Sequence, residues 1–216
     1  MNDNKTKKLT TIGMLCAVAY LLMLFFRIPV VLFLKYEPKD VVITIGGFLM
    51  GPMTAFIISV VVALIEMIAT SDTGIIGCIM NAISSCAFAC TASFIYKYKK
   101  NIKGAVAGLV VGTIFMIIIM LLWNYLITPL YMNVPREQVI PLLIPAFLPF
   151  NLLKGSLNSA ITFLVYKPIV SSLRKANLLP QTDSIMVKKS YTGSMLVCAL
   201  IIITCIFFVL TMQGII

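Results

Sequence analysis

Long apolar stretches alternate with short polar ones along most of this sequence. Six of them fall before residue 175, at about 9–26, 41–50, 53–69, 74–96, 104–127 and 147–173. Each except the second approaches the roughly 20 residues that cross a bilayer core as an α-helix. A seventh apolar stretch covers about 195–212. The pattern predicts an all-α integral membrane protein, with a bundle of six transmembrane helices and an additional C-terminal hydrophobic segment.

The connections between these stretches differ in character. Residues 27–40 contain Pro29, Pro38 and mixed charges, which predicts a long, extended first external loop rather than a helix. Gly51-Pro52 predicts a tight turn between the second and third helices. Three prolines between residues 141 and 149 predict that Val139–Ala146 is a surface or re-entrant piece ahead of the sixth helix.

The polar stretch that follows the sixth helix divides the chain in two. Residues 1–175 are expected to form the membrane domain, and residues 176–216 a polar linker with the C-terminal hydrophobic segment. That segment suits a seventh span, a peripheral helix or a disordered tail. The two halves of the chain show no internal repeat, which disfavours an inverted-repeat secondary transporter.

Composition supports the membrane interpretation. The chain is 61% hydrophobic and 11% charged, whereas soluble domains carry about 25% charged residues. The net charge is +10, but Lys and Arg cluster in short loops between spans, which does not indicate nucleic-acid binding. With the N-terminus inside, twelve of them lie on the inner side and only four outside, so the N-terminus is predicted to be cytoplasmic. The four outer residues are Arg27, Lys35, Lys39 and Arg136.

Several kinds of chemistry have no residues to support them. The chain has no histidine, no G-x-x-x-x-G-K-[ST] motif and only seven acidic residues. We therefore expect no catalytic site, no metal site and no ATP hydrolysis in this chain. A membrane enzyme, such as a lipid-head-group transferase, remains an alternative with little support. The six cysteines all lie in apolar stretches and are expected to act as packing groups.

Lys154 is the most informative polar residue, because a lysine at the centre of a span costs on the order of 2.5–3.5 kcal/mol. Asn151 lies three residues before it and Asn158 four after, so the three share one helix face. The alternative is a lysine that reaches the outer interface while the amides hold helices together. The convergence of this face with other polar groups favours a binding site.

Two further residues near the outer ends of spans are candidates. Asn124 lies beside Trp123 and Tyr125, and its amide offers donors and an acceptor to a planar heterocycle. Glu66 lies near the outer end of the third helix. It is expected either to accept hydroxyl donors from a ligand or to pair with Lys154.

Three candidates come from the first loop and the second helix. Thr44 suits either a cavity wall or helix packing. Asp40 suits the N-cap of the second helix and, as an alternative, a ligand contact. Tyr36, beside Lys35, lies in a loop that could close over an outer pocket. Together these groups predict an outward-facing pocket for a flat, neutral, polar-edged molecule that carries hydroxyls.

Several motifs give a more specific indication. Residues 33–40 (FLKYEPKD), 45–52 (IGGFLMGP), 123–125 (WNY) and 149–155 (PFNLLKG) occur in this order. Over about residues 9–175 the chain resembles the riboflavin-specific substrate-binding subunits of energy-coupling-factor transporters. The additional segment from about Met195 departs from that family's pattern.

The resemblance implies both a function and partners. It implies a six-helix subunit in a prokaryotic cell membrane that holds riboflavin in its outer half, beneath the first loop. Asn124, Asn151 and Lys154 match positions that bond the ring system. The implied partners are a transmembrane coupling subunit, expected to dock on the small residues Gly13 and Ala17, and two cytoplasmic ATPases. A subunit for a different vitamin is the nearest alternative.

Overall fold

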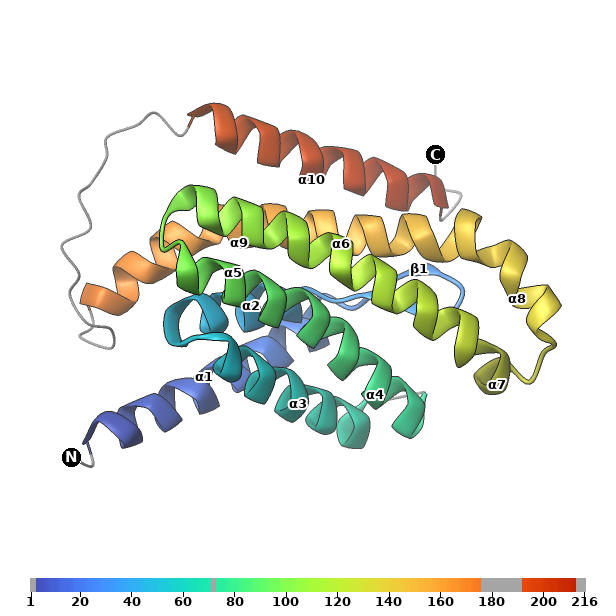
Figure 1. Cartoon of the computed structure of the whole chain (residues 1–216), viewed down its shortest axis with the longest axis horizontal. Helices are drawn as coiled ribbons and strands as arrows, with labels where there is room; N and C mark the ends of the chain where they lie inside the picture. The colour runs from blue at the N-terminus through green and yellow to red at the C-terminus, as the bar shows by residue number, and fades with distance from the viewer. Residues whose placement is uncertain (1–2, 71–72, 176–191, 213–216) are drawn as a thin grey trace.

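The computed structural model describes residues 3–70, 73–175 and 192–212, and nearly all of these are helical. The long helices lie side by side in one bundle (Figure 1). In chain order the helices are α1 (Asp3–Phe25), α2 (Lys39–Met50), α3 (Pro52–Ala69), α4 (Gly74–Ser85), α5 (Thr91–Tyr98), α6 (Ile102–Leu126), α7 (Thr128–Met132), α8 (Arg136–Leu142), α9 (Leu148–Lys175) and α10 (Thr192–Met212). The predicted all-α membrane fold is confirmed.

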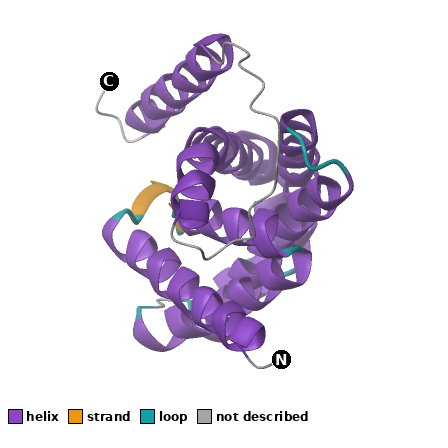
Figure 2. Cartoon of the chain, turned by 90° about the vertical axis from the view of Figure 1, so that its left-hand side faces the viewer, coloured by secondary structure: helices purple, strands orange, loops and turns teal. Residues whose placement is uncertain are grey.

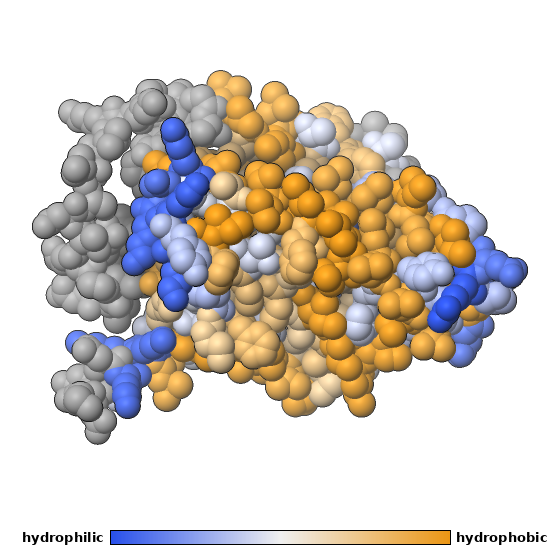
Figure 3. Space-filling model, in the orientation of Figure 1, coloured by the Kyte–Doolittle hydropathy of each residue, from blue (hydrophilic) through white to orange (hydrophobic). Residues whose placement is uncertain are grey.

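Five continuous helical segments are long and apolar enough to cross a membrane, beginning at residues 5, 52, 74, 102 and 136. The third, fourth and fifth predicted helices agree with the structure to within two residues at each end. Figure 3 shows a broad apolar belt around the middle of the bundle, with hydrophilic residues gathered at both ends. Large apolar side chains such as Phe56, Ile114 and Phe115 are exposed along this belt. Lipid is the solvent that suits such a surface.

The second predicted helix, α2, is short and almost entirely enclosed. It has 12 residues, a length of about 18 Å, which is less than the roughly 30 Å of a bilayer core. Gly51 follows it with φ of 99°, a left-handed conformation that suits glycine. Pro52 then occupies the first turn of α3, where its missing N–H costs nothing. The predicted tight turn is therefore confirmed.

Two of the helices contain a π-helical turn. Cys86–Cys90 joins α4 to α5, and Leu143–Phe147 joins α8 to α9. The prediction that prolines interrupt the helix, so that Val139–Ala146 is a surface or re-entrant piece, is wrong. Arg136–Tyr166 forms one continuous helical span of 31 residues. Each proline lacks an N–H donor, and the π turn accommodates the missing hydrogen bonds without ending the helix.

The first loop, between α1 and α2, contains a small β-hairpin. Strands β1 (Ile28–Val31) and β2 (Leu34–Tyr36) pair antiparallel, with Ile28 opposite Tyr36. Leu32 at the turn has φ of 52°. Val30, Leu34 and Tyr36 are buried in a cluster with Phe147, at the end of the π turn, and Phe150 of α9. The extended loop that the prolines predicted is thus an ordered element that packs against the bundle.

The C-terminal hydrophobic segment forms α10, which lies alongside α9 and runs antiparallel to it (Figures 1 and 2). Figure 2 places it on the opposite side of the bundle from α1. Cys198 and Cys205 on α10 are buried, so the disordered-tail alternative is wrong for residues 192–212. Most of the predicted polar linker, residues 176–191, lies outside the described residues. All six cysteines are free thiols, in agreement with a packing role.

Small residues let the central helices approach closely. A Cβ at Gly108 would lie 2.6 Å from the Ala92 carbonyl oxygen, and one at Gly112 would lie 2.7 Å from that of Phe88. These contacts bring α6 against the helix that contains α4 and α5, as small residues do between membrane helices. The tight packing holds the polar residues of α4 at a fixed distance from α6 and α9.

Candidate functional site

A cavity of about 250 Å³ lies between the hairpin, α4, α6 and α9. Its polar lining comes from Arg27, Lys35, Glu37, Asn81, Ser84, Asn151 and Lys154. Its apolar lining includes Phe33, Leu34, Met80, Met120, Tyr131 and Phe150. A cavity therefore lies beneath the first loop. Its polar and apolar side chains, here called its polar and apolar walls, come in part from the same elements, the hairpin, α4 and α9.

A narrow apolar crevice continues from this cavity. It shares Phe33, Met80 and Tyr131 with the cavity and extends toward Trp123 on α6 and Ile127. Phe33 and Tyr131 meet edge to face, with ring centroids 5.4 Å apart. Aromatic and aliphatic walls beside a polar wall suit a planar ligand with a polar edge.

Lys154 and Asn151 both line the cavity from α9. The Asn151 amide nitrogen donates to the Phe147 carbonyl at 2.7 Å. Its side-chain oxygen has no partner among the described residues, so this acceptor is available to a ligand. The Lys154 ammonium donates to Ser84 Oγ at 3.3 Å. One turn of α9 thus presents a donor and an acceptor side by side.

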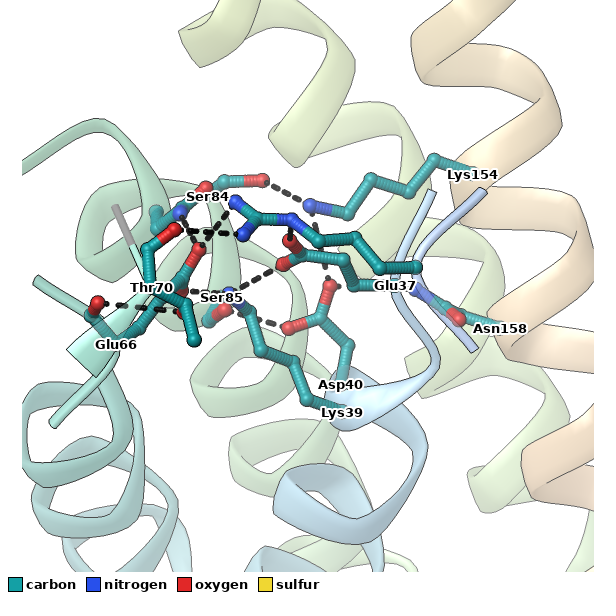
Figure 4. Close-up of polar contacts among 11 residues, drawn as sticks. Glu37, Lys39, Asp40, Glu66, Thr70, Ser84, Ser85, Lys154 and Asn158 are labelled. Atoms are coloured by element: carbon teal, nitrogen blue, oxygen red, sulfur yellow. Dashed lines mark hydrogen bonds and ion pairs between the residues drawn. The ribbon is translucent and has the colours of Figure 1, made fainter. Parts of the chain in front are cut away.

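The charge of Lys154 is balanced by Asp40, whose Oδ2 lies 3.4 Å from the ammonium nitrogen (Figure 4). Asp40 is fully buried and also accepts from Ser85 Oγ at 2.5 Å and from Asn158 Nδ2 at 3.2 Å. Asn158 in turn accepts from the Tyr36 hydroxyl at 3.0 Å. A continuous chain of contacts therefore runs from the hairpin, through Asn158 and Asp40, to the cavity wall.

Burial raises the pKa of the Tyr36 phenol well above its ordinary value, and the neighbouring Asp40 and Cys205 raise it further. A phenolate buried next to a carboxylate is poorly solvated and is repelled by the neighbouring negative charge, so the neutral phenol is favoured. Tyr36 therefore stays protonated and remains a hydrogen-bond donor to Asn158.

A second charged cluster lies beside the first. Glu66 on α3 pairs with Lys39 and, at 3.2 Å, with Arg27 Nη2, and it accepts from Asn81 Nδ2 at 2.9 Å. Glu37 pairs with Lys39 at 2.6 Å and with Arg27 at 2.9 Å. Each carboxylate is therefore shared between the same two cations. This cluster ties the hairpin to the C-terminal end of α3 and to the middle of α4 (Figure 4).

The two clusters together are electrically balanced. Arg27, Lys39 and Lys154 supply three positive charges, and Glu37, Asp40 and Glu66 supply three negative ones. Buried ions are tolerated only when each is paired and hydrogen-bonded. These six residues therefore carry no net charge together, and Lys35 is a further cation in the lining.

Two expectations about these residues are wrong. Asp40 is not the N-cap of α2, because Pro38 occupies that position and no side chain caps the helix. Asp40 lies inside the first turn, from which its carboxylate reaches Ser85 and Lys154. Glu66 does not pair with Lys154, because it lies with Arg27 and Lys39 in the other cluster.

The remaining candidates lie behind the lining or away from it. Asp40 and Glu66 contact lining residues, and Tyr36 contacts Asn158 behind the lining, but none of the three lines the cavity itself. Thr44 is fully buried, and its hydroxyl donates to the Asp40 backbone carbonyl at 2.7 Å, which fits helix packing. Asn124 donates to the Met120 carbonyl at 2.7 Å and accepts from the Thr128 hydroxyl at 2.9 Å.

Sequence reasoning missed Arg27, Glu37 and Lys39, which it counted only as loop charges. Their signal was the dense run of alternating charge directly before an apolar helix, although such runs usually face solvent. It also missed Asn81 and Ser84 on α4, whose spacing of three residues places two polar groups on one face of a span. Among the described residues, no cluster of three metal-ligating side chains occurs.

The sequence profile of the family "ECF transporter, substrate-specific component" matches residues 7–166. The chain belongs to this family. The S component described here is 28% identical to the riboflavin transporter RibU of Staphylococcus aureus over 184 residues, which cover 81% of this chain and 96% of that protein. It is 29% identical to the riboflavin transporter FmnP of Bacillus subtilis over 188 residues, which cover 81% of this chain and 99% of that protein. The riboflavin transporter RibU of Streptococcus thermophilus is 30% identical over 181 residues, which cover 79% of this chain and 86% of that protein.

The fold agrees with this family. The solved structure of the S component of a bacterial ECF transporter superposes with a TM-score of 0.68 at 29% identity. The similarity covers 79% of this chain and 99% of that one. The family profile ends at residue 166, well before α10 begins at Thr192. The C-terminal helix therefore lies outside the part of the chain that the family profile matches.

Proposed function

We propose that this chain binds riboflavin from the extracellular side and delivers it across the membrane as the substrate-capture subunit of an ATP-driven ECF transporter. Family membership and three relatives named as riboflavin transporters support the substrate. The observation that carries the proposal is the cavity itself, in which Asn151 and Lys154 face an apolar, aromatic wall.

Riboflavin matches the two walls chemically. Its tricyclic ring is flat and apolar on its faces, and it carries carbonyl and imide groups along one edge. The free Asn151 oxygen can accept from the imide N–H, while the Lys154 ammonium can donate to a ring carbonyl. The ribityl hydroxyls then suit the other polar lining residues Ser84, Asn81 and Glu37.

The other predicted binding residues have supporting roles in this proposal. Tyr36, Asp40 and Glu66 hold the lining residues in place, and Thr44 supports the backbone of Asp40. Asn124 bonds to Met120 and Thr128 and so supports the α6 side of the cavity, which Met120 lines one helical turn away. The ligand thereby contacts the outer ends of several helices at once.

The orientation follows from the charge distribution. With the N-terminus cytoplasmic, the lysine-rich end of the bundle faces the cell interior, as the positive-inside rule requires. Arg27 and Glu66 near the cavity lie at the C-terminal ends of α1 and α3, which is the opposite end of the bundle from the N-terminus. The cavity then opens toward the outside, where it captures its substrate.

Partner subunits supply the energy in this proposal. The sequence contains no P-loop, so two cytoplasmic ATPases hydrolyse ATP and a transmembrane coupling subunit transmits the change. Gly13 and Ala17 lie on an exposed face of α1, and no atom lies within 4 Å of a Cβ placed on Gly13. Such a small-residue surface allows close approach by a partner helix.

Ligand measurements on the purified protein test the proposal. The protein purified from cells supplied with riboflavin should be yellow, and added riboflavin should lose its fluorescence on binding. Cells that lack the ATPases should not accumulate riboflavin through this chain. Absence of binding at micromolar riboflavin, with tight binding of another vitamin, would replace the substrate but keep the transporter class.

A further inference from the structure

The hairpin is held between two different surfaces. On its inner side Leu34, Lys35 and the adjacent Glu37 line the cavity. On its outer side Val30 packs in a buried cluster that includes Cys205 of α10. The same short segment therefore contacts both the ligand site and the C-terminal helix.

One face of α10 makes this contact. Ile201, Cys205, Phe208 and Val209 pack against the cluster that contains the hairpin. Their spacing of four, three and one residues places them on a single helix face. Ile203 and Phe207, on the other face, are 55% and 57% exposed along the apolar belt. α10 thus has a bound face and a lipid-facing face of similar composition.

The hairpin depends on such packing for its position. Its two strands contain four and three residues, and an isolated two-stranded hairpin is marginally stable at best. A movement of the hairpin away from the cavity would change the packing of Val30 and Leu34 in the cluster that contains Cys205.

We propose that α10 holds the hairpin closed over the cavity and thereby sets the rate at which the ligand enters and leaves. This inference rests on the proposed function, because it assigns α10 a role in retaining riboflavin. Since the family profile ends before α10, retention by this helix is a property that this chain adds to the S-component fold. α10 is long enough for the role, because its 21 residues extend about 32 Å along the bundle.

Two double variants of the full-length protein form a matched pair. Ile201→Ala/Phe208→Ala removes apolar side chains from the bound face, and Ile203→Ala/Phe207→Ala removes the same residue types from the lipid-facing face. Both variants lose equal volume and equal hydrophobicity from α10. Only the first should loosen the hairpin, because only its residues contact the buried cluster.

Riboflavin dissociation is the first measurement. The protein is loaded with riboflavin and diluted, and the return of flavin fluorescence is followed in time. The bound-face variant should release riboflavin roughly fivefold faster or more than the lipid-face variant, because contacts that hold a site closed act mainly on dissociation. Equal dissociation rates for the two variants would overturn the proposal.

Hydrogen–deuterium exchange of residues 28–36, without any ligand, is the second measurement. Exchange should be faster in the bound-face variant and unchanged in the lipid-face variant. If no protein form binds riboflavin but exchange still differs, the proposed substrate fails while the contact of α10 with the hairpin stands. If the bound-face variant does not fold, Phe208→Ala and Phe207→Ala replace the pair, and equal exchange in these two would reject the role of α10.

Discussion

Asn158 joins Tyr36 to Asp40. Its side-chain oxygen accepts from the Tyr36 hydroxyl at 3.0 Å, and its side-chain nitrogen donates to Asp40 Oδ2 at 3.2 Å. Asp40 in turn balances Lys154. Asn158, which does not line the cavity, therefore influences the position of Lys154, which does. The buried amide of Asn158 therefore connects the hairpin to the Asp40–Lys154 pair at the cavity wall.

Removal of the Tyr36 hydroxyl tests this connection. Tyr36→Phe leaves the Asn158 oxygen without its donor, and a buried acceptor that loses its partner costs on the order of 1–3 kcal/mol. We expect riboflavin affinity to fall about tenfold, measured by fluorescence quenching. Tyr98→Phe is the matched control, because Tyr98 is exposed. An unchanged affinity in Tyr36→Phe would show that the hairpin is held without Asn158.

Lys154 should affect stability and binding separately. Lys154→Met leaves Asp40 buried without its cation, and breaking a buried ion pair in this way costs about 3–5 kcal/mol. Thermal unfolding in detergent should therefore show a clearly lowered midpoint. In Lys154→Met/Asp40→Asn the unpaired charge is gone, so stability should recover while riboflavin affinity stays low. Recovery of both properties would mean that Lys154 has only a structural role.

Asn151 and Asn124 should differ in their effects. Asn151 has a free acceptor in the cavity lining, so Asn151→Ala should weaken riboflavin binding about tenfold, as loss of one such contact does. Asn124 already bonds to Met120 and Thr128, so Asn124→Ala should lower the thermal midpoint and weaken binding less. Titrations of the two variants side by side decide the order. A larger loss of binding in Asn124→Ala would indicate that its side chain turns toward the ligand.

The cluster around Glu66 should matter mainly for stability. Glu66→Gln leaves Arg27 and Lys39 to share the single carboxylate of Glu37, and we expect a loss on the order of 3 kcal/mol because Lys39 is buried. Glu66→Gln combined with Lys39→Met removes the excess charge and should regain most of that loss. Thermal unfolding of the single and double variants provides the measurement. A double variant less stable than Glu66→Gln would contradict the pairing.

Much of the fold could be predicted from the sequence, because lipid imposes a strong rule on every span. The helices from residue 52 to residue 126 were placed to within two residues for this reason. The prolines between residues 141 and 149 were misjudged, because a single sequence does not reveal that a π turn absorbs their missing donors. The hairpin was missed as well, since two strands of four and three residues leave little periodicity to detect.

The site was predicted in part for a similar reason. Lys154 and Asn151 stood out because a polar residue within a long apolar span has few explanations. Arg27, Glu37 and Lys39 did not stand out, because charges in a loop are normally solvated and only tertiary packing buries them. The partners within the site were also unpredictable. By charge alone, Glu66 and Asp40 were equally good partners for Lys154. Only the structure distinguishes them, because Glu66 lies 3.2 Å from Arg27 and Asp40 lies 3.4 Å from Lys154.

The enclosure of α2 has a consequence for membranes of different thickness. Every residue from Lys39 to Phe48 is buried, so this helix meets other helices and not lipid. A thicker or thinner bilayer acts by hydrophobic mismatch on the outer helices, which adjust their tilt. The position of Asp40 at the start of α2, which pairs with Lys154 of the cavity lining, is insulated from that adjustment. The subunit can therefore tilt within the bilayer and keep its binding geometry.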